Sequence, residues 1–99
     1  MKIHHLKAWP PIYQAMLDGR KPFDFRKNDR GFAAGDIVVF WEWDPEALRE
    51  PYTGRFFDAT ITYLIHGGQF GIPKGFVVFA FEKGVDEIRL YEHEMLHAE

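Results

Sequence analysis

The chain has 99 residues, of which 46% are hydrophobic and 17% aromatic, and its formal net charge is −3. This length is typical of one domain, here residues 1–99, and the hydrophobic content excludes a disordered chain. The absence of cysteine excludes disulfides and thiolate catalysis, and the acidic balance argues against a general nucleic-acid-coating protein. No apolar stretch resembles a signal peptide or a transmembrane helix, so we expect a cytoplasmic protein without a membrane partner.

The first elements along the chain are a short strand and a helix. HHLKAW, residues 4–9, predicts the strand. Two prolines then suit a first helical turn, and Ile12, Ala15 and Met16 recur at helical spacing. Gly19 suits the position just after the C-terminus of a helix. These signals predict one helix near the start of the chain, with Ile12, Ala15 and Met16 on its apolar face.

FDFRKN, residues 23–28, alternates aromatic with polar side chains and predicts a second strand. We expect Phe23 and Phe25 to anchor this strand on the core, with Asp24 and Arg26 on its opposite face. Lys21 comes just before the strand, where the end of the helix meets it.

Three further strands are predicted. DIVVFWEW, residues 36–43, is apolar on both faces, which is typical of an enclosed strand. FFDATITYLI, residues 56–65, alternates so that every second residue from Phe57 faces inward, Tyr63 and Ile65 included. FVVFAFE, residues 76–82, predicts the last strand, and the tail after it fits either a strand or a short helix. The sum is a small β-rich domain with one early helix, most simply a strongly bent sheet or a barrel.

Two motifs suggest chemistry that their context does not support. HEMLH, residues 93–97, matches the His-Glu-x-x-His zinc motif, in which His93 and His97 would lie one helical turn apart beside Glu94. Only two residues follow, so a third downstream ligand is almost excluded, and we predict no metal site and no cofactor. HGGQFG, residues 66–71, lacks the spacing of a phosphate-binding glycine motif, and its glycines predict a tight turn with close backbone approach.

The charged stretch GRKPFDFRKNDRG, residues 19–31, has two interpretations. It is either an edge strand kept soluble by charge or an anion site in which Asp24 fixes the orientation of Lys21 and Arg26. The alternation with two phenylalanines favours the anion site, because it places Asp24 on a partly enclosed strand.

GRKPFDFR, residues 19–26, matches the pattern Gly-x-Lys-x-x-Glu-x-Arg of ASCH domains, with Asp24 in place of the glutamate. The wider layout over residues 3–82 resembles the small ASCH-like proteins of the DUF3850 family, which are common in phages and bacteria. ASCH domains belong to the PUA-like superfamily. The resemblance therefore implies an α+β pseudo-barrel of five to six strands, with the early helix crossing one end. The tail, residues 83–99, lies outside it.

The resemblance also implies a function and a site. Signature residues of ASCH and PUA-like relatives line a cleft proposed to bind RNA or a modified nucleoside, and here they correspond to Gly19, Lys21, Asp24 and Arg26. Some ASCH proteins hydrolyse N4-acetylcytidine with a lysine, a threonine and a glutamate. Lys21 matches the lysine, whereas Asp24 occupies the position of the threonine.

Three hypotheses follow for the function. The leading one is an RNA- or nucleotide-binding module with a small cationic cleft, whose expected residues are Lys21, Asp24, Arg26, Lys27 and Arg30, with Trp43 or Tyr63 stacking on a base. The second is a hydrolase of a modified nucleoside or RNA in which Lys21 and Asp24 are catalytic. The third is a phage-type protein-interaction module. The sequence leaves catalysis and oligomeric state open.

Overall fold

The computed structural model of the protein describes residues 1–84. The motif from His93 to His97 and the ambiguous tail lie outside these residues. The elements, in chain order, are β1 (Ile3–Ala8), α1 (Pro10–Leu17), β2 (Phe23–Lys27), β3 (Ile37–Trp43), β4 (Tyr52–His66) and β5 (Phe76–Lys83). No helix among these elements is both long and apolar enough to cross a membrane.

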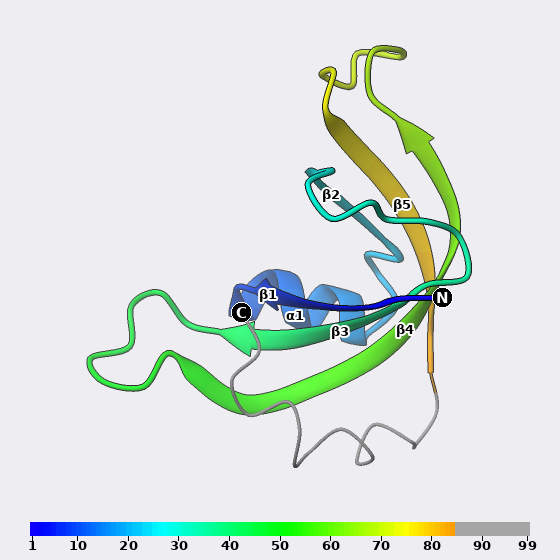
Figure 1. Ribbon diagram of the computed structural model, residues 1–99. Coiled ribbons are helices and arrows are strands. Elements are labelled where there is room, and N and C mark those ends of the chain that lie inside the picture. Colours follow the sequence, from blue (N-terminus) through cyan, green and yellow to red (C-terminus); the bar gives the residue numbers. More distant parts are fainter. Residues whose placement is uncertain (85–99) are drawn as a thin grey trace.

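The strands form one sheet in the order β1-β3-β4-β5-β2 (Figure 1). β1 runs parallel to β3, and the other neighbouring strands are antiparallel. The long strand β4 pairs with β3 through residues 52–60 and with β5 through residues 59–66, so it belongs to both halves of the sheet. The sheet curls along β4 into a half-barrel, which confirms the predicted bent, β-rich domain with one early helix.

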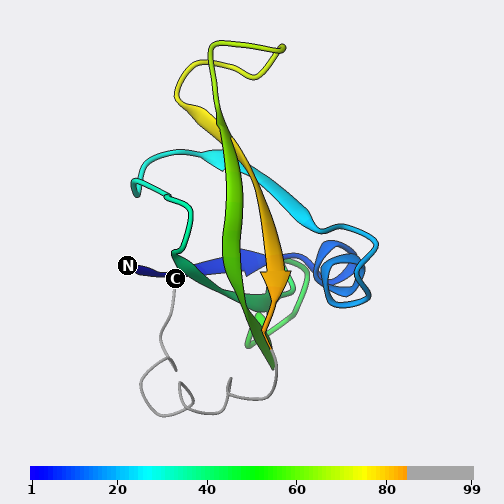
Figure 2. The same ribbon diagram turned by 90° about the vertical axis from the view of Figure 1, so that its right-hand side faces the viewer.

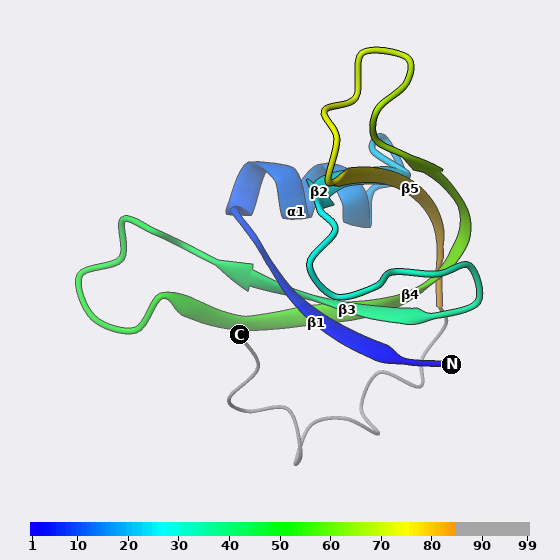
Figure 3. The ribbon, with the colours of Figure 1, turned by 45° about the horizontal axis from the view of Figure 1, so that its top comes forward.

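The core fills the concave side of this half-barrel. Val38, Phe40, Ala59, Val77 and Phe79 have no exposed surface. α1 lies between β2 and the β1–β3 part of the sheet (Figures 1 and 3). All five residues from 38 to 42 of β3 are buried, which confirms that this strand is enclosed on both faces.

The helix ends as predicted, and of the three residues at helical spacing Met16 is buried whereas Ile12 is exposed. Gly19 follows it with φ +84°, a left-handed conformation that glycine adopts without steric cost, and its N–H donates to the carbonyl of Met16. Tyr13 and Met16 are the buried residues, and the ring of Tyr13 packs 5.3 Å from that of Phe57. Ile12 is 41% exposed, so its helical spacing with Met16 does not place it in the core. A helix of two turns buries only a narrow stripe, and Ile12 lies one residue outside it.

The phenylalanines of β2 lie on the face opposite to the predicted one, whereas the expected enclosure of Asp24 is confirmed. Phe23 and Phe25 are 45% and 49% exposed, whereas Asp24 is buried. The register explains the reversal, because Asp24 lies opposite Phe79, a fully buried residue of β5 on the concave face. Side chains directly opposite each other in a sheet point to the same face, so Asp24 must point inward. Its charge is tolerated there because cations accompany it.

The alternation predicted for β4 holds only as far as Ile61. The register shifts between Ile61 and Tyr63, and a β-bulge of this kind inserts one extra residue. Beyond it Leu64 lies opposite the buried Phe79 and packs against the core, whereas Tyr63 is 66% exposed. The inward orientation predicted for Tyr63 is therefore wrong. The glycine-rich turn is as predicted, since a Cβ at Gly67 would collide with the carbonyl of Pro73.

Candidate binding cleft

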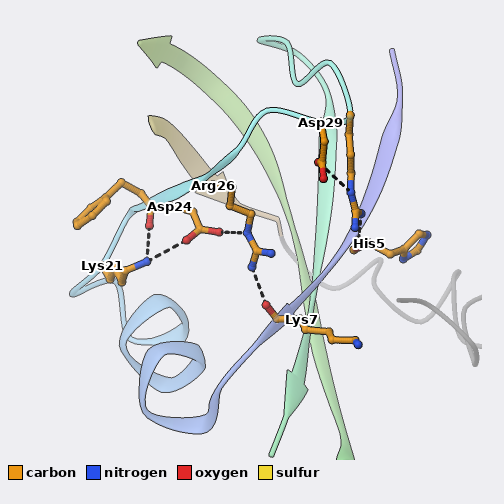
Figure 4. A network of polar contacts seen from close by, with 8 residues as sticks. His5, Lys7, Lys21, Asp24, Arg26 and Asp29 are labelled. Carbon is orange, nitrogen blue, oxygen red and sulfur yellow. Dashed lines mark hydrogen bonds and ion pairs between the residues drawn. The ribbon is translucent and has the colours of Figure 1, made fainter. Parts of the chain in front are cut away.

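The two edge strands of the sheet, β1 and β2, meet through arginine side chains rather than through a strand-to-strand ladder. Arg26 Nη2 donates to the carbonyl of Lys7 at 2.6 Å, and Arg30 Nη1 donates to the carbonyl of His5 at 2.7 Å (Figure 4). Arg26 belongs to β2 and Arg30 to the segment that follows it. We call this junction the seam. It closes the half-barrel and satisfies two backbone acceptors of β1.

Asp24 holds the cations at one side of the seam. Its Oδ2 accepts from Arg26 Nε at 2.6 Å, and its Oδ1 accepts from Lys21 Nζ at 3.2 Å (Figure 4). Lys21 Nζ also donates to the carbonyl of Phe23 and lies 4.9 Å from the centre of the Phe23 ring. Both carboxylate oxygens therefore have a cationic partner, and the carboxylate fixes both cations in place.

A cleft of about 500 Å³ lies along the seam. Its lining combines apolar, cationic and acidic side chains from β1, α1, β2 and the β2–β3 loop. The lining residues are Leu6, Lys7, Ala8, Trp9, Ile12, Asp24, Phe25, Arg26, Lys27, Asp29, Arg30, Phe32 and Phe76. A volume of this size is within the range of small-molecule sites.

The cleft has an apolar floor and a rim with unused hydrogen-bond donors. Leu6, Ala8 and Phe32 are buried, whereas Trp9 is 55% exposed. Within residues 1–84, Arg26 Nη1 and Lys27 Nζ donate no hydrogen bond, although the Arg26 guanidinium is ion-paired with Asp24 through Nε. The cleft can therefore accept a flat apolar group on its floor and an anionic group at its rim.

Four of the predicted site residues line this cleft, namely Asp24, Arg26, Lys27 and Arg30. Lys21 is outside the lining but contacts it through Asp24. The two residues expected to stack on a base lie elsewhere. Trp43 is half-buried with Lys7 Nζ 4.8 Å from its ring centre, and Tyr63 lies on the convex face of the sheet.

The sequence did not identify Trp9 and Phe32 as aromatic residues of the cleft. Trp9 is the residue between β1 and α1, directly before Pro10. A large side chain between a strand and a helix belongs to the regular face of neither element. The position of Trp9 before a proline that starts a helix was the sequence signal that could have identified it. Phe32 could not have been found in this way, because only the tertiary fold brings its loop over β1.

Other buried polar groups lie outside the cleft. Asp36, at the start of β3, accepts hydrogen bonds from His4 Nε2 at 2.8 Å and from the backbone N–H groups of Lys2 and Ala33. Burial by itself would raise the pKa of Asp36, but these hydrogen bonds outweigh it and lower the pKa below its ordinary value. Burial also raises the pKa of Tyr13 to about 12.

Among residues 1–84, no group of three or more His, Asp or Glu side chains is arranged to hold a metal ion. Glu42, the buried carboxylate near α1, accepts from the Thr53 hydroxyl at 2.6 Å and lies 3.7 Å from Arg55 Nη1. It therefore has partners within the fold. These contacts join β4 to β3. Glu42 does not line the cleft, whereas the polar groups of the seam do.

Comparisons with known proteins support the resemblance to the DUF3850 family. The family described as "Domain of unknown function (DUF3850)" matches residues 3–81, which include all the described strands except the last two residues of β5. The chain is also 36% identical over 61 residues to the "Uncharacterized 12.9 kDa protein in GpA 3'region" of Escherichia phage P2. That alignment covers 62% of this chain and 52% of the phage protein, so the chain spans about half of the relative's length. The chain belongs to the DUF3850 family.

Proposed function

We propose that the cleft binds a nucleotide, either free or as one unpaired base of an RNA together with its phosphate. The observation that carries the proposal is the combination of an apolar floor, an exposed indole and unused cationic donors in one cleft. Nucleotides offer the matching groups, a flat π-face and an anionic phosphate.

Each part of the ligand has a counterpart in the cleft. The base lies on the floor formed by Leu6, Ala8 and Phe32, with one face against Trp9. Its phosphate lies at the rim, where Arg26 Nη1 and Lys27 Nζ donate to the oxygens. Arg26 is already oriented by Asp24 and by the carbonyl of Lys7, so little side-chain entropy is lost when an anion binds.

The likeness of residues 19–26 to the ASCH pattern supports the same proposal, because the signature residues of ASCH and PUA-like domains line a cleft proposed to bind RNA or a modified nucleoside. In this proposal Asp24 is a positioning residue rather than a base, since Lys21 and Arg26 occupy its two oxygens. We therefore favour binding over hydrolysis.

The test is the affinity of the purified protein for nucleoside monophosphates and for short oligouridylates, measured by calorimetry. We expect Trp9→Ala to weaken binding about tenfold, because it removes one base-stacking surface. Lys27→Ala is expected to weaken binding by a similar factor, because it removes one charge-assisted contact to phosphate.

Two exposed residues outside the cleft lining give matched controls. Leu48 and Arg49 belong to the β3–β4 loop and line no part of the cleft. Leu48→Ala and Arg49→Ala should leave affinity unchanged. The proposal fails if no nucleotide or oligouridylate binds at millimolar concentration, or if the Arg49 variant weakens binding as much as the Lys27 variant.

A further inference from the structure

The convex face of β2, β5 and β4 carries a set of exposed aromatic and aliphatic side chains. Figure 2 shows these three strands side by side. The register arranges their outward residues in two apolar rows, Phe23–Ala80–Tyr63 and Phe25–Val78–Ile65. We call these six residues the outer platform. The rows are about 6–7 Å apart along the strands.

The platform exposes more aromatic surface than a scattered apolar residue would. Phe23 and Phe25 are 45% and 49% exposed, and Tyr63 is 66% exposed. Phe23 and Tyr63 flank the small Ala80, so their Cα atoms are about 10 Å apart across three strands. A small residue between two rings leaves room for a flat group to lie against either ring.

Cations border the platform on the side of β2. Lys21 Nζ lies over the Phe23 ring, and Lys27 follows Phe25 on the same face of the strand. The two rows contain no acidic side chain. Aromatic rings of a sheet beside lysines are the combination with which proteins bind single strands, since every base has a π-face and every link carries a negative phosphate.

The platform is continuous with the cleft across the edge of β2. Phe25 belongs to the platform and also lines the cleft. Its ring stacks on that of Phe76, at 5.3 Å between centres, and Phe76 lines the cleft as well. Lys27, at the rim of the cleft, lies opposite Phe76 in the sheet. A ligand that leaves the cleft over β2 therefore meets the platform directly.

We infer that the outer platform is a second base-stacking site, and that the ligand is a single-stranded nucleic acid of several nucleotides that crosses the edge of β2. This inference rests on the proposed function of the cleft. One nucleotide occupies the cleft, and the neighbouring bases stack on Phe25, Phe23 and Tyr63. Lys21 and Lys27 then contact the phosphates that link the two sites.

The inference is tested by comparing uridine monophosphate with oligouridylates of about four and about eight nucleotides, by fluorescence anisotropy with competition. The unchanged protein should bind the longer oligomer more tightly than the monophosphate. Phe23→Ala and Tyr63→Ala should each weaken binding of the octamer about five- to fiftyfold and leave the monophosphate unaffected. Tyr63→Phe, which keeps the ring, should retain the affinity.

Several outcomes separate this inference from the proposed function. If Trp9→Ala weakens all ligands while the platform variants weaken none, the cleft binds nucleotides and the platform inference is overturned. If the platform variants weaken the octamer while Trp9→Ala has no effect, bases stack on the platform and the cleft proposal fails. If Lys27→Ala also has no effect on the octamer, the inferred path across the edge of β2 is overturned. Sedimentation gives a third readout. A dimer of the unchanged protein that Phe23→Ala converts to a monomer would make the platform a protein interface and overturn the inference.

Discussion

Asp36 shows how a single buried residue makes the fold sensitive to pH. It is 4% exposed, and its carboxylate accepts hydrogen bonds from His4 and from two backbone N–H groups. These contacts join β1, the β2–β3 loop and the start of β3. Because its pKa is lowered in the folded state, Asp36 stabilises the fold fully above its ordinary pKa of 3.8, and the stabilisation is lost as the pH falls through its lower folded pKa.

We therefore predict that the free energy of unfolding, measured in urea, falls as the pH drops below 3.8. Asp36→Asn should lower stability at neutral pH by about 1–3 kcal/mol and make the acid limb of the pH profile shallower. Asp18 provides the control, because its pKa is also lowered, chiefly by its hydrogen bond from Arg20, but its carboxylate is exposed. An acid limb unchanged in Asp36→Asn would contradict this account.

At the residue scale, the sequence predicted the ionic partners of Asp24 correctly but not which face of β2 packs on the core. Lys21 and Arg26 lie close to Asp24 along the chain, so local spacing was enough to bring the three charges together. Which face of β2 they occupy depends on pairing with β5, a strand about 50 residues further on. Sequence alternation separates the two faces of β2 but does not say which one is enclosed. The phenylalanine face is apolar, and the face with Asp24 and Arg26 can be enclosed because its charges pair with each other.

At the scale of elements, the seam differs from the other junctions of the described sheet because no backbone ladder forms it. Neighbouring strands elsewhere are joined by backbone ladders, whereas β1 and β2 are joined through Arg26 and Arg30. Arg26 is also the partner of the buried Asp24, so its removal would leave a buried carboxylate with Lys21 as its remaining partner. Arg26 thus has a structural role beside the one proposed in binding.

We predict that Arg26→Ala lowers the free energy of unfolding by about 2–4 kcal/mol, since it removes one side of a buried ion pair and a hydrogen bond to β1. Asp24→Asn combined with Arg26→Ala should be less destabilising than the sum of the two single changes, because no uncompensated carboxylate remains. Urea unfolding of the four proteins in this cycle measures the coupling. Additive effects of the two changes would show that the ion pair contributes nothing to the seam.

Strands β3 and β4 show what an apolar sequence pattern can and cannot predict about the orientation of side chains. The enclosed strand β3 was predicted correctly because five consecutive apolar or aromatic residues, Ile37 to Trp41, exclude a half-exposed strand. The orientation of Tyr63 was predicted wrongly. A bulge of one residue in β4 reverses the alternation, and no residue type in the sequence indicates where that bulge lies. That reversal is what moves an expected core residue to the outer platform.

At the scale of the whole molecule, the charge is distributed unevenly along the chain. Residues 1–84 contain 11 basic and 10 acidic side chains, a net charge of +1, whereas residues 85–99 contain one basic and five acidic side chains. The acidic balance of the chain therefore comes from residues 85–99. A half-barrel close to neutral, with cations gathered at the seam, is compatible with a short nucleic-acid footprint that involves about two or three phosphates.

The whole molecule also sets a limit on what sequence could predict of the site. Arg26 and Lys27 were identified from β2 alone, but the cleft exists only because curling of the sheet brings β1 and α1 across from β2. Trp9 and Phe32 are therefore site residues that no local pattern in β2 could have predicted. The family match over residues 3–81 covers the segments that form the cleft.

The central claim, that the seam cleft binds a nucleotide, is tested most directly by following the three tryptophan indole N–H signals of the protein by NMR during titration with a short oligouridylate. Trp9 lines the cleft, whereas Trp41 is buried with its Nε1 hydrogen-bonded to His5, and Trp43 lies beneath Lys7. We predict a saturable shift of the Trp9 signal while those of Trp41 and Trp43 stay in place. A shift of Trp43 with Trp9 unmoved, or no shift at millimolar ligand, would contradict the account.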